Sequence, residues 1–227
     1  MLIQVKELLS QDLVERCRNL LASASWTDGK QTAGTQAAQA KNNQQIAEDA
    51  PMLDELRSII VRQIHRNGLF FTASLPKKVF PPLFNRYSGD TNSFGNHVDN
   101  AIRTYAKNGE CIRTDISCTV FLSDPNEYEG GELIIEDAYG ANSVKLAAGD
   151  AILYPSTSLH RVEPVTKGAR IASFFWIESM VRSNDARRIL FDMDMAILSM
   201  RQTHGDSEQA VVLTSCYHNL LRLFADT

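Results

Sequence analysis

The chain has 227 residues, enough for one sizeable core or for one core with an appended helical segment. Hydrophobic residues make up 44% and charged residues 22%, and both values are those of an ordinary soluble globular protein. The formal net charge is −4, and no stretch is strongly basic. Nucleic acid and anionic membranes are therefore not expected as partners.

The N-terminal stretch, MLIQVKELLSQDLVERC, lacks the basic-then-apolar layout of a signal peptide. No apolar run approaches the ~20 residues that a membrane span needs. The cysteines, which form no CxxC pair, are Cys17, Cys111, Cys118 and Cys216. Their scatter predicts buried or free thiols in a reducing compartment, so we expect a cytoplasmic protein, and a bacterial cytosol would suit it.

The first quarter of the chain predicts helices and one irregular segment. After a weakly alternating start that predicts a short strand, Ser10 and Asp12 are candidate caps for a helix running to about Ala24. The segment Trp26–Asn43 is rich in Gly, Thr, Ala, Gln and Asn, which predicts a loop with one short strand at most. Pro51 suits the first turn of a second amphipathic helix.

The sequence pattern changes from helix-forming to strand-forming at Phe70. Strand-forming runs alternate with turn signals: FFTASL, VFPPLFNRYSG, IRTYA, IRTDISCTVFLSD, GGELIIED, NSVKLAAGDAILYPS, HRVEPV and GARIASFFWIES. Short strands at regular spacing without crossover helices predict an antiparallel sandwich or barrel. The expected fold is mostly β with flanking helices (α+β), with its β core at about residues 70–178.

Helical periodicity returns after Ser179. Ser183 or Asn184 can cap one helix, and a second helix follows residues 204–207. We predict a domain of residues 1–179 and a C-terminal helical extension of residues 180–227. The two C-terminal helices either brace the β core or pair between subunits of a homo-oligomer, and the sequence leaves both open.

The stretch FGNHVDN contains the first candidate site residues. His97 and Asp99 are two positions apart, so on a strand or at its end both side chains project from one face. His160 begins another predicted strand, 63 residues downstream of His97. Two histidines and one carboxylate match the facial triad of non-haem iron(II) enzymes, which leaves three coordination positions open. Taken alone, an HxD pair usually lies on the protein surface and binds no metal, and a lone histidine is usually structural.

Arg170 follows His160 by ten residues and shares a strand face with Ala172, Phe174 and Trp176. An arginine on the apolar face of a strand is costly unless a carboxylate meets it. Its planar guanidinium suits the far carboxylate of a dicarboxylic keto acid whose other end chelates a metal. The alternative is a half-exposed arginine whose stem packs on the sheet.

Four motifs carry a resemblance to a known family: WTDGKQTAGTQAAQAKNNQQ, FNRYSGDTNSFGNHVDNAIR, RTDISCTVFLSDPNEYEGGEL and KLAAGDAILYPSTSLHRVEPVTKGARIASFFWIES. With them the sequence resembles the iron- and 2-oxoglutarate-dependent dioxygenases of the prolyl/lysyl hydroxylase-like class. More narrowly, it is similar to the bacterial PKHD-type hydroxylases linked to iron uptake. The resemblance extends over essentially the whole chain.

The resemblance implies a double-stranded β-helix (jelly-roll) core and a hydroxylase that decarboxylates 2-oxoglutarate to succinate and CO2. It implies that His97, Asp99 and His160 hold Fe(II) and that Arg170 anchors 2-oxoglutarate. Tyr87 matches a position where related hydroxylases place a tyrosine near the keto acid, although it would serve equally well as a core aromatic. L-ascorbate is the usual accessory reductant of the class, and a link to iron or siderophore uptake is implied.

Three alternatives stay open on the residues alone. A His2Asp site can also hold zinc in a hydrolase, or iron in a cupin-like enzyme that uses no 2-oxoglutarate, but either leaves Arg170 without a role. A non-catalytic sensor of iron or 2-oxoglutarate could use the same site. The substrate, a small molecule or a peptidyl side chain, is not identified by any pattern. We expect Trp26–Asn43 to line or cover the pocket, since irregular segments beside a rigid core often carry specificity.

Overall fold

The computed structural model describes residues 1–32 and 35–227. The helices are α1 (Gln11–Ala22), α2 (Thr35–Ala40), α3 (Leu53–Arg66), α4 (Gly68–Ser74), α5 (Asn184–His204) and α6 (Glu208–Phe224). The strands are β1 (Ile3–Val5), β2 (Trp26–Asp28), β3 (Lys41–Asn42), β4 (Gln44–Ile46), β5 (Pro76–Val79), β6 (Leu83–Tyr87), β7 (Ser93–His97), β8 (Ile102–Thr104), β9 (Cys111–Arg113), β10 (Ile116–Phe121), β11 (Tyr128–Gly130), β12 (Leu133–Asp137), β13 (Gly140–Val144), β14 (Ala151–Pro155), β15 (His160–Val162), β16 (Val165–Gly168) and β17 (Arg170–Ser179).

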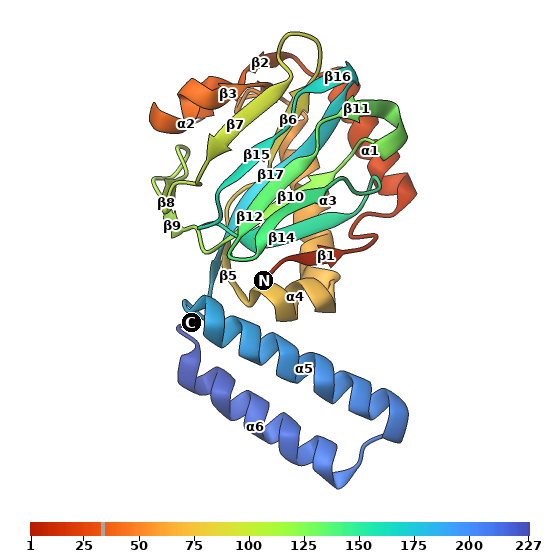
Figure 1. Cartoon of the computed structure of the whole chain (residues 1–227), viewed down its shortest axis with the longest axis vertical. Helices are drawn as coiled ribbons and strands as arrows, with labels where there is room; N and C mark the ends of the chain where they lie inside the picture. Colours follow the sequence, from red (N-terminus) through yellow and green to blue (C-terminus); the bar gives the residue numbers. More distant parts are fainter. Residues whose placement is uncertain (33–34) are drawn as a thin grey trace.

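Two antiparallel sheets face each other and form the core (Figure 1). The larger sheet has the order β1-β14-β10-β17-β6-β4-β2, with β5 beside β17. The smaller sheet has the order β13-β12-β15-β7-β3. Sequence neighbours are often not sheet neighbours, as in a jelly roll, so that residues far apart in the chain meet between the sheets. The predicted fold class, mostly β with flanking helices around a jelly-roll core, is confirmed.

Strand β10 shows why the larger sheet forms a central layer, because its whole length is buried. Cys118 and Val120 belong to the apolar cluster that α1 and α3 complete on the outer face. Phe121, on the opposite face, packs in a second cluster with Leu133 and Val162 of the smaller sheet. A strand covered on both faces carries no charged residue, and in the run ISCTVF only the small hydroxyl side chains of Ser117 and Thr119 interrupt the apolar residues.

The N-terminal helices form where they were predicted, with two differences. Ser10 occupies the N-cap position of α1, but its side chain makes no capping hydrogen bond. The run FFTASL, expected as a strand, lies in α4 instead, capped by the Asn67 side chain, which accepts from the Phe70 amide. Short apolar runs do not distinguish a strand from a buried helix, and the capping asparagine was the local signal that favoured the helix.

The expectation of a loop at Trp26–Asn43 is wrong for most of that segment. It holds β2, a 3-10 turn at Gly29–Thr32, α2 and β3, while residues 33–34 lie outside the described chain. β3 pairs with β7 so that Lys41 lies opposite Phe94. This pairing joins the N-terminal segment to the smaller sheet, and no local pattern announces a two-residue strand.

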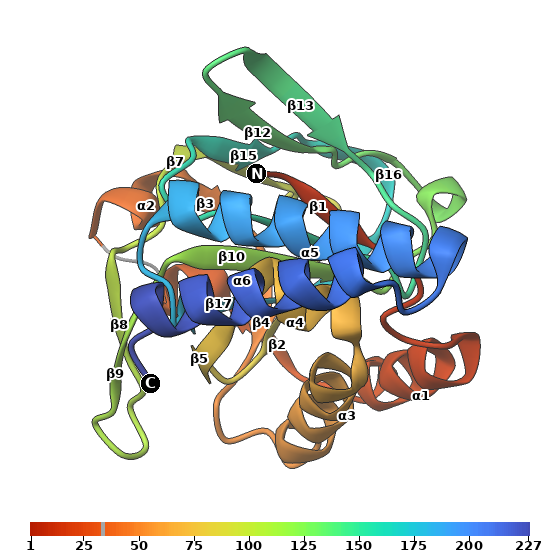
Figure 2. The same ribbon diagram turned by 90° about the horizontal axis from the view of Figure 1, so that it is seen from below.

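Helices α5 and α6 form an antiparallel hairpin at one end of the β core (Figures 1 and 2). Ser183 caps α5, as predicted, by accepting a hydrogen bond from the Ala186 amide. A small apolar cluster joins the hairpin to the core through Leu75, Val181, Ala186, Leu190, Ile197 and Tyr217. The hairpin therefore braces the core. Pairing between subunits and the domain division at residues 179/180 stay predictions.

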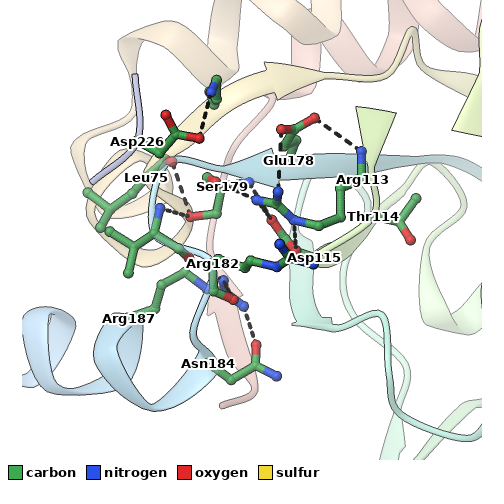
Figure 3. A network of polar contacts seen from close by, with 12 residues as sticks. Leu75, Arg113, Thr114, Asp115, Glu178, Ser179, Arg182, Asn184, Arg187 and Asp226 are labelled. Atoms are coloured by element: carbon green, nitrogen blue, oxygen red, sulfur yellow. Dashed lines mark hydrogen bonds and ion pairs between the residues drawn. The ribbon is translucent and has the colours of Figure 1, made fainter. Parts of the chain in front are cut away.

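A polar network fastens the start of this hairpin to the sheet (Figure 3). Arg113 donates to both carboxylate oxygens of Asp115, at 2.7 and 2.9 Å, and to the Ser179 carbonyl at 3.2 Å. The Ser179 amide donates to Asp115 in return. Arg187 is buried just beyond, and donates to the carbonyls of Val181 and Arg182.

Among residues 1–32 and 35–227, no helix has both the length and the apolarity to span a bilayer.

Candidate active site

A pocket opens between the two sheets and holds about 730 Å³ of space, part of it open to solvent. Its walls come from strands of both sheets (β3, β6, β7, β10, β12, β14, β15 and β17), from β8 and from the chain after β7. The side chains that line it include those of Lys41, Asn85, Tyr87, Phe94, His97, Asp99, Arg103, Ser117, His160, Arg170, Phe174 and Trp176. All five site residues predicted from the sequence are among them.

The structure brings His97, Asp99 and His160 together. His97 ends β7, His160 begins β15, and the two are directly paired across the sheet. Asp99 lies just beyond the end of β7, and one of its carboxylate oxygens is 3.7 Å from His160 Nε2. One ligand atom from each of the three residues lies within 4.8 Å of the others. This spacing suits a single metal ion bound by two imidazoles and a carboxylate.

Each imidazole is oriented by a backbone carbonyl. His97 Nδ1 is 2.8 Å from the Gly95 carbonyl oxygen, and His160 Nδ1 is 3.0 Å from the Ser158 carbonyl oxygen. A carbonyl only accepts, so Nδ1 carries the proton in both rings and Nε2 presents its lone pair. This arrangement keeps each imidazole in the tautomer whose Nε2 can bind a metal. The Phe94 ring stacks on His97, with centroids 3.5 Å apart.

The electrostatics of the site favour neutral imidazole at His97. Burial, followed by the neighbouring His160, lowers the pKa of His97 to about 4. A neutral ring is the form that ligates a metal, and it needs no proton release on binding.

A chain of hydroxyls supports Asp99 from the larger sheet. Ser117 on β10 donates to an Asp99 carboxylate oxygen at 2.6 Å. The Ser156 hydroxyl lies 2.7 Å from the Ser117 hydroxyl, so it supplies the next hydrogen bond. Because Ser117 and Ser156 are buried, they hold Asp99 from the larger sheet, at the same carboxylate oxygen that lies 3.7 Å from His160 Nε2.

Arg170 lies deep in the pocket, opposite Tyr87 in the β17–β6 register. Only 1% of Arg170 is exposed, and its guanidinium carbon is 5.2 Å from the Tyr87 ring centroid and 5.1 Å from that of Phe121. Within residues 1–32 and 35–227, no carboxylate forms an ion pair with it, and its Nε has no hydrogen-bond partner. A buried cation without an anion carries a large desolvation cost. An anionic ligand at the base of the pocket would remove that cost.

Tyr87 is as buried as Arg170, and burial raises the pKa of its hydroxyl while the nearby arginine acts in the opposite direction. The hydroxyl therefore stays protonated and can donate a hydrogen bond. It receives a long contact of 3.5 Å from the Asn85 amide. Its position beside Arg170 suits either a contact to a bound carboxylate or simple packing between the sheets.

Comparisons with known proteins agree with this geometry. Residues 82–178 match the 2OG-Fe(II) oxygenase superfamily, and residues 185–226 match the PKHD-type hydroxylase C-terminal domain. A PKHD-type hydroxylase of Polaromonas sp. is 55% identical over 227 residues, and one of Saccharophagus degradans is 56% identical; each alignment covers all of both chains. The chain belongs to the PKHD-type hydroxylases. It is therefore an iron- and 2-oxoglutarate-dependent dioxygenase whose substrate is unidentified.

Solved structures share the fold of this PKHD-type hydroxylase. A prolyl-4-hydroxylase of Pseudomonas putida aligns with a TM-score of 0.51 at 20% identity, covering 78% of this chain and 92% of its own. A Trichoplax adhaerens prolyl hydroxylase, in complex with a hypoxia inducible factor peptide, has a TM-score of 0.55 at 15% identity, covering 83% and 86%. HygX of Streptomyces hygroscopicus, with nickel, 2-oxoglutarate and hygromycin B bound, has a TM-score of 0.52 at 12% identity, covering 78% and 82%. At these identities the likeness concerns the fold alone.

Sequence reasoning missed several residues of the PKHD-type pocket. Ser117 had a signal, because Ser117 and Thr119 place hydroxyls at alternate positions of an otherwise apolar strand, on the face that meets the pocket. Lys41 and Arg103 had none, since the first reaches the pocket through the two-residue strand β3 and the second through the β8–β9 hairpin.

Other expectations about the pocket had mixed outcomes. Leu133, Phe174 and Trp176 line it, whereas Phe121 and Ile135 lie in the apolar core beside it. The N-terminal segment contributes through Lys41 and Asn43, but Trp26 stacks its ring on Arg86 instead, 4.9 Å from the guanidinium carbon.

The glycine pair Gly130–Gly131, before β12, serves the backbone. Gly130 has φ of +73°, and a Cβ there would lie 2.1 Å from the Pro164 carbonyl oxygen. The turn therefore excludes any larger residue.

Proposed function

We propose that His97, Asp99 and His160 hold the Fe(II) of this dioxygenase, and that Arg170 with Tyr87 receives the distal carboxylate of 2-oxoglutarate. The observation that carries the proposal is the buried guanidinium of Arg170, whose Nε has no partner among residues 1–32 and 35–227. A dicarboxylic acid is the ligand class that fits, because one end can reach the arginine while the other reaches the triad.

Iron and 2-oxoglutarate, when bound, supply the oxidising chemistry that consumes dioxygen, releases succinate and CO2 and hydroxylates a C–H bond of the substrate. The residues of the chain bind and orient. The carbonyls of Gly95 and Ser158 fix the Nε2 atoms of the two histidines, and Ser117 fixes Asp99. Apolar side chains such as Phe94 and Leu133 keep water from the reacting atoms.

An anaerobic titration tests these assignments. Fe(II) and then 2-oxoglutarate are added to metal-free protein, and the visible charge-transfer band of a chelated keto acid is followed. We expect the band in the wild type, its loss in His160→Ala, and a higher 2-oxoglutarate requirement in Arg170→Ala. His204→Ala, at the exposed end of α5, is the control and should leave the band unchanged.

A zinc hydrolase and a non-catalytic sensor give different results in the same preparation. Iron that binds without any band would contradict the 2-oxoglutarate assignment. A band without substrate-stimulated release of succinate would indicate a sensor. The family membership favours turnover over a sensor, and the buried arginine favours a 2-oxoglutarate site over a hydrolase.

Three finer proposals rest on the resemblance to the family. L-ascorbate serves as accessory reductant, which a larger number of turnovers per enzyme in its presence would support. The protein works in the cytoplasm, which cell fractionation tests. Its substrate belongs to iron or siderophore uptake, and a deletion strain with unaltered growth under iron limitation would contradict that link.

A further inference from the structure

The outer part of the pocket carries positive charge that the iron site does not use. Among the residues that the structure describes, the lining cations besides Arg170 are Lys41 on β3 and Arg103 on β8, and the only lining carboxylate is Asp99. If Fe(II) and the 2-oxoglutarate dianion cancel, and Asp99 cancels one cation, Arg103 keeps a full positive charge and Lys41 a partial one, because burial lowers the pKa of Lys41 to about 7. They lie inside a protein whose formal net charge is −4.

Neighbouring acids do not remove this excess. Glu48, whose charge acts on Arg103, is held by Arg57 through two contacts of 2.9 Å. Asp28, whose charge acts on Lys41, is exposed, and one of its oxygens accepts the Lys30 amide. The segment 31–37, QTAGTQA, contains no acidic residue.

Both cations are built into the pocket wall rather than extended into solvent. Only 4% of Lys41 is exposed, and its Nζ lies 5.4 Å from the Phe94 ring centroid and 5.7 Å from that of Phe174. The guanidinium carbon of Arg103 lies 4.2 Å from the Trp176 ring centroid. Burial of a cation against aromatic rings restricts its position, so it can offer a directed contact to an anion.

The aromatic rings between the two cations give the site an apolar floor. Phe174 and Trp176 lie on the same face of β17 as Arg170, and their rings meet edge to face with centroids 5.6 Å apart. Lys41 stands over the first ring and Arg103 over the second. Arg170 marks the far end of the same strand face, so the two ends of the pocket can bind two separate anions.

We propose that Lys41 and Arg103 bind a carboxylate group of the molecule to be hydroxylated, and that Phe174 and Trp176 contact the apolar carbons beside it. The primary substrate is then a small organic acid, and a lysyl side chain is disfavoured by its charge. This inference rests on the proposed function, since it takes Arg170 and the triad as the site of 2-oxoglutarate and iron.

A matched trio of probes tests the charge requirement directly. Phenylacetate, phenylacetamide and phenethylamine have similar size and differ in charge. Ligand-observed NMR measures their binding to anaerobic protein loaded with Fe(II) and 2-oxoglutarate, with Zn(II)-loaded protein as a diamagnetic duplicate. We expect phenylacetate to bind most tightly and phenethylamine most weakly. Equal binding of acid and amide, or no binding of the acid, would overturn the proposal whatever the variants do.

Variants then assign the contact. Lys41→Met and Arg103→Gln should each weaken phenylacetate about tenfold or more, the size expected for one charge-assisted contact in a partly buried site. Lys167→Met, at a lysine whose side chain is 76% exposed on β16, should leave it unchanged. Unaltered phenylacetate binding in both pocket variants would contradict the assignment.

The charge-transfer band separates this inference from the function beneath it. Wild type and both variants should form the band at similar 2-oxoglutarate concentrations. A band that weakens in Lys41→Met would place this lysine with the co-substrate and overturn the proposal while leaving the dioxygenase assignment intact. A wild type without a band would instead contradict the iron and 2-oxoglutarate assignment itself.

Discussion

Two buried arginines, one in the pocket and one under the C-terminal hairpin, show how differently this chain treats the same side chain. Arg187 is 3% exposed and donates to two backbone carbonyls and to the Asn184 side chain (Figure 3). Arg170 is 1% exposed, and its Nε finds no acceptor in the described chain. The fold itself supplies hydrogen-bond acceptors to Arg187, whereas among the described residues it supplies no acceptor to Nε of Arg170, which a bound ligand could provide.

The surroundings of the two arginines extend the contrast. Around Arg187, neighbouring Arg113, Asp115 and Ser179 exchange hydrogen bonds that link β9 and the residue before β10 to the end of β17. Arg187 itself donates to the carbonyls of Val181 and Arg182, which precede α5. Around Arg170 lie the rings of Tyr87 and Phe121 and the side chain of Tyr128, whose hydroxyl pKa burial raises and the arginine acts to lower. A polar network whose groups all have partners stabilises a junction. A buried charged group that lacks an anionic partner in a pocket instead identifies a ligand site.

Exchanging each arginine for methionine should produce opposite results, and this is the largest effect that we predict. Arg170→Met removes a buried charge without an acid partner, so the free energy of unfolding should hold or rise, while 2-oxoglutarate binding weakens about 30-fold or more. Arg187→Met leaves carbonyls without donors and should cost about 1.5–3 kcal/mol of stability, with 2-oxoglutarate binding unchanged. Urea denaturation and titration of the charge-transfer band measure the two quantities. Loss of stability in Arg170→Met would contradict the view that Arg170 serves a ligand and not the fold.

The degree to which the sequence predicted this site depends on how local each signal is. His97 and Asp99 are two residues apart, and Arg170 follows from the alternation of one long strand, so simple parity arguments place them. The β-rich core and the two terminal helices were predicted for the same reason, because periodicity is a local property. The expected strand at FFTASL failed because a short apolar run suits a buried helix equally well.

Lys41, Arg103 and the Ser156 support of Ser117 were out of reach of such reasoning. Lys41 enters the pocket only because β3 adds to β7, a pairing across about 50 residues of chain that sequence spacing does not encode. The hydroxyl contact between Ser117 and Ser156 also joins distant strands, 39 residues apart in sequence. Long-range strand pairing places the residues on the substrate side of the pocket, whereas local sequence patterns predict those on the iron side.

Ser117 tests whether the pocket's polar groups serve a ligand. Ser117→Ala removes the hydrogen bond behind Asp99 and should lower Fe(II) affinity about 10–100-fold, the usual cost of losing a group that orients a metal ligand. Ser199→Ala, at an exposed position of α5, is the matched control and should leave the affinity unchanged. Anaerobic competition with a chromophoric chelator provides the measurement. Equal affinities in the two variants would mean that Asp99 needs no support.

The pH dependence of stability gives a third, smaller contrast between pocket and hairpin. The pKa of His97 falls from 6.5 to about 4 on folding, so between these values the unfolded chain binds a proton that the native protein does not. The free energy of unfolding of metal-free protein should therefore be complete above pH 6.5 and decline as the pH falls toward 4. His97→Gln should flatten this slope, and His204→Gln on the hairpin should preserve it. Urea denaturation at several pH values would show an unaltered slope in His97→Gln if another group were responsible.

The smallest predicted effect concerns a polar group that belongs wholly to the fold. Ser183 caps α5 through the Ala186 amide, whereas Ser10 occupies the same position on α1 without a side-chain hydrogen bond. Ser183→Ala should therefore cost about 1 kcal/mol of stability and Ser10→Ala less than about 0.5 kcal/mol, as chemical denaturation would measure. Neither change should alter the 2-oxoglutarate titration, because both serines lie outside the pocket lining. A shifted titration in Ser183→Ala would instead mean that the hairpin and the pocket are coupled, and that the separation drawn between the two arginines is incomplete.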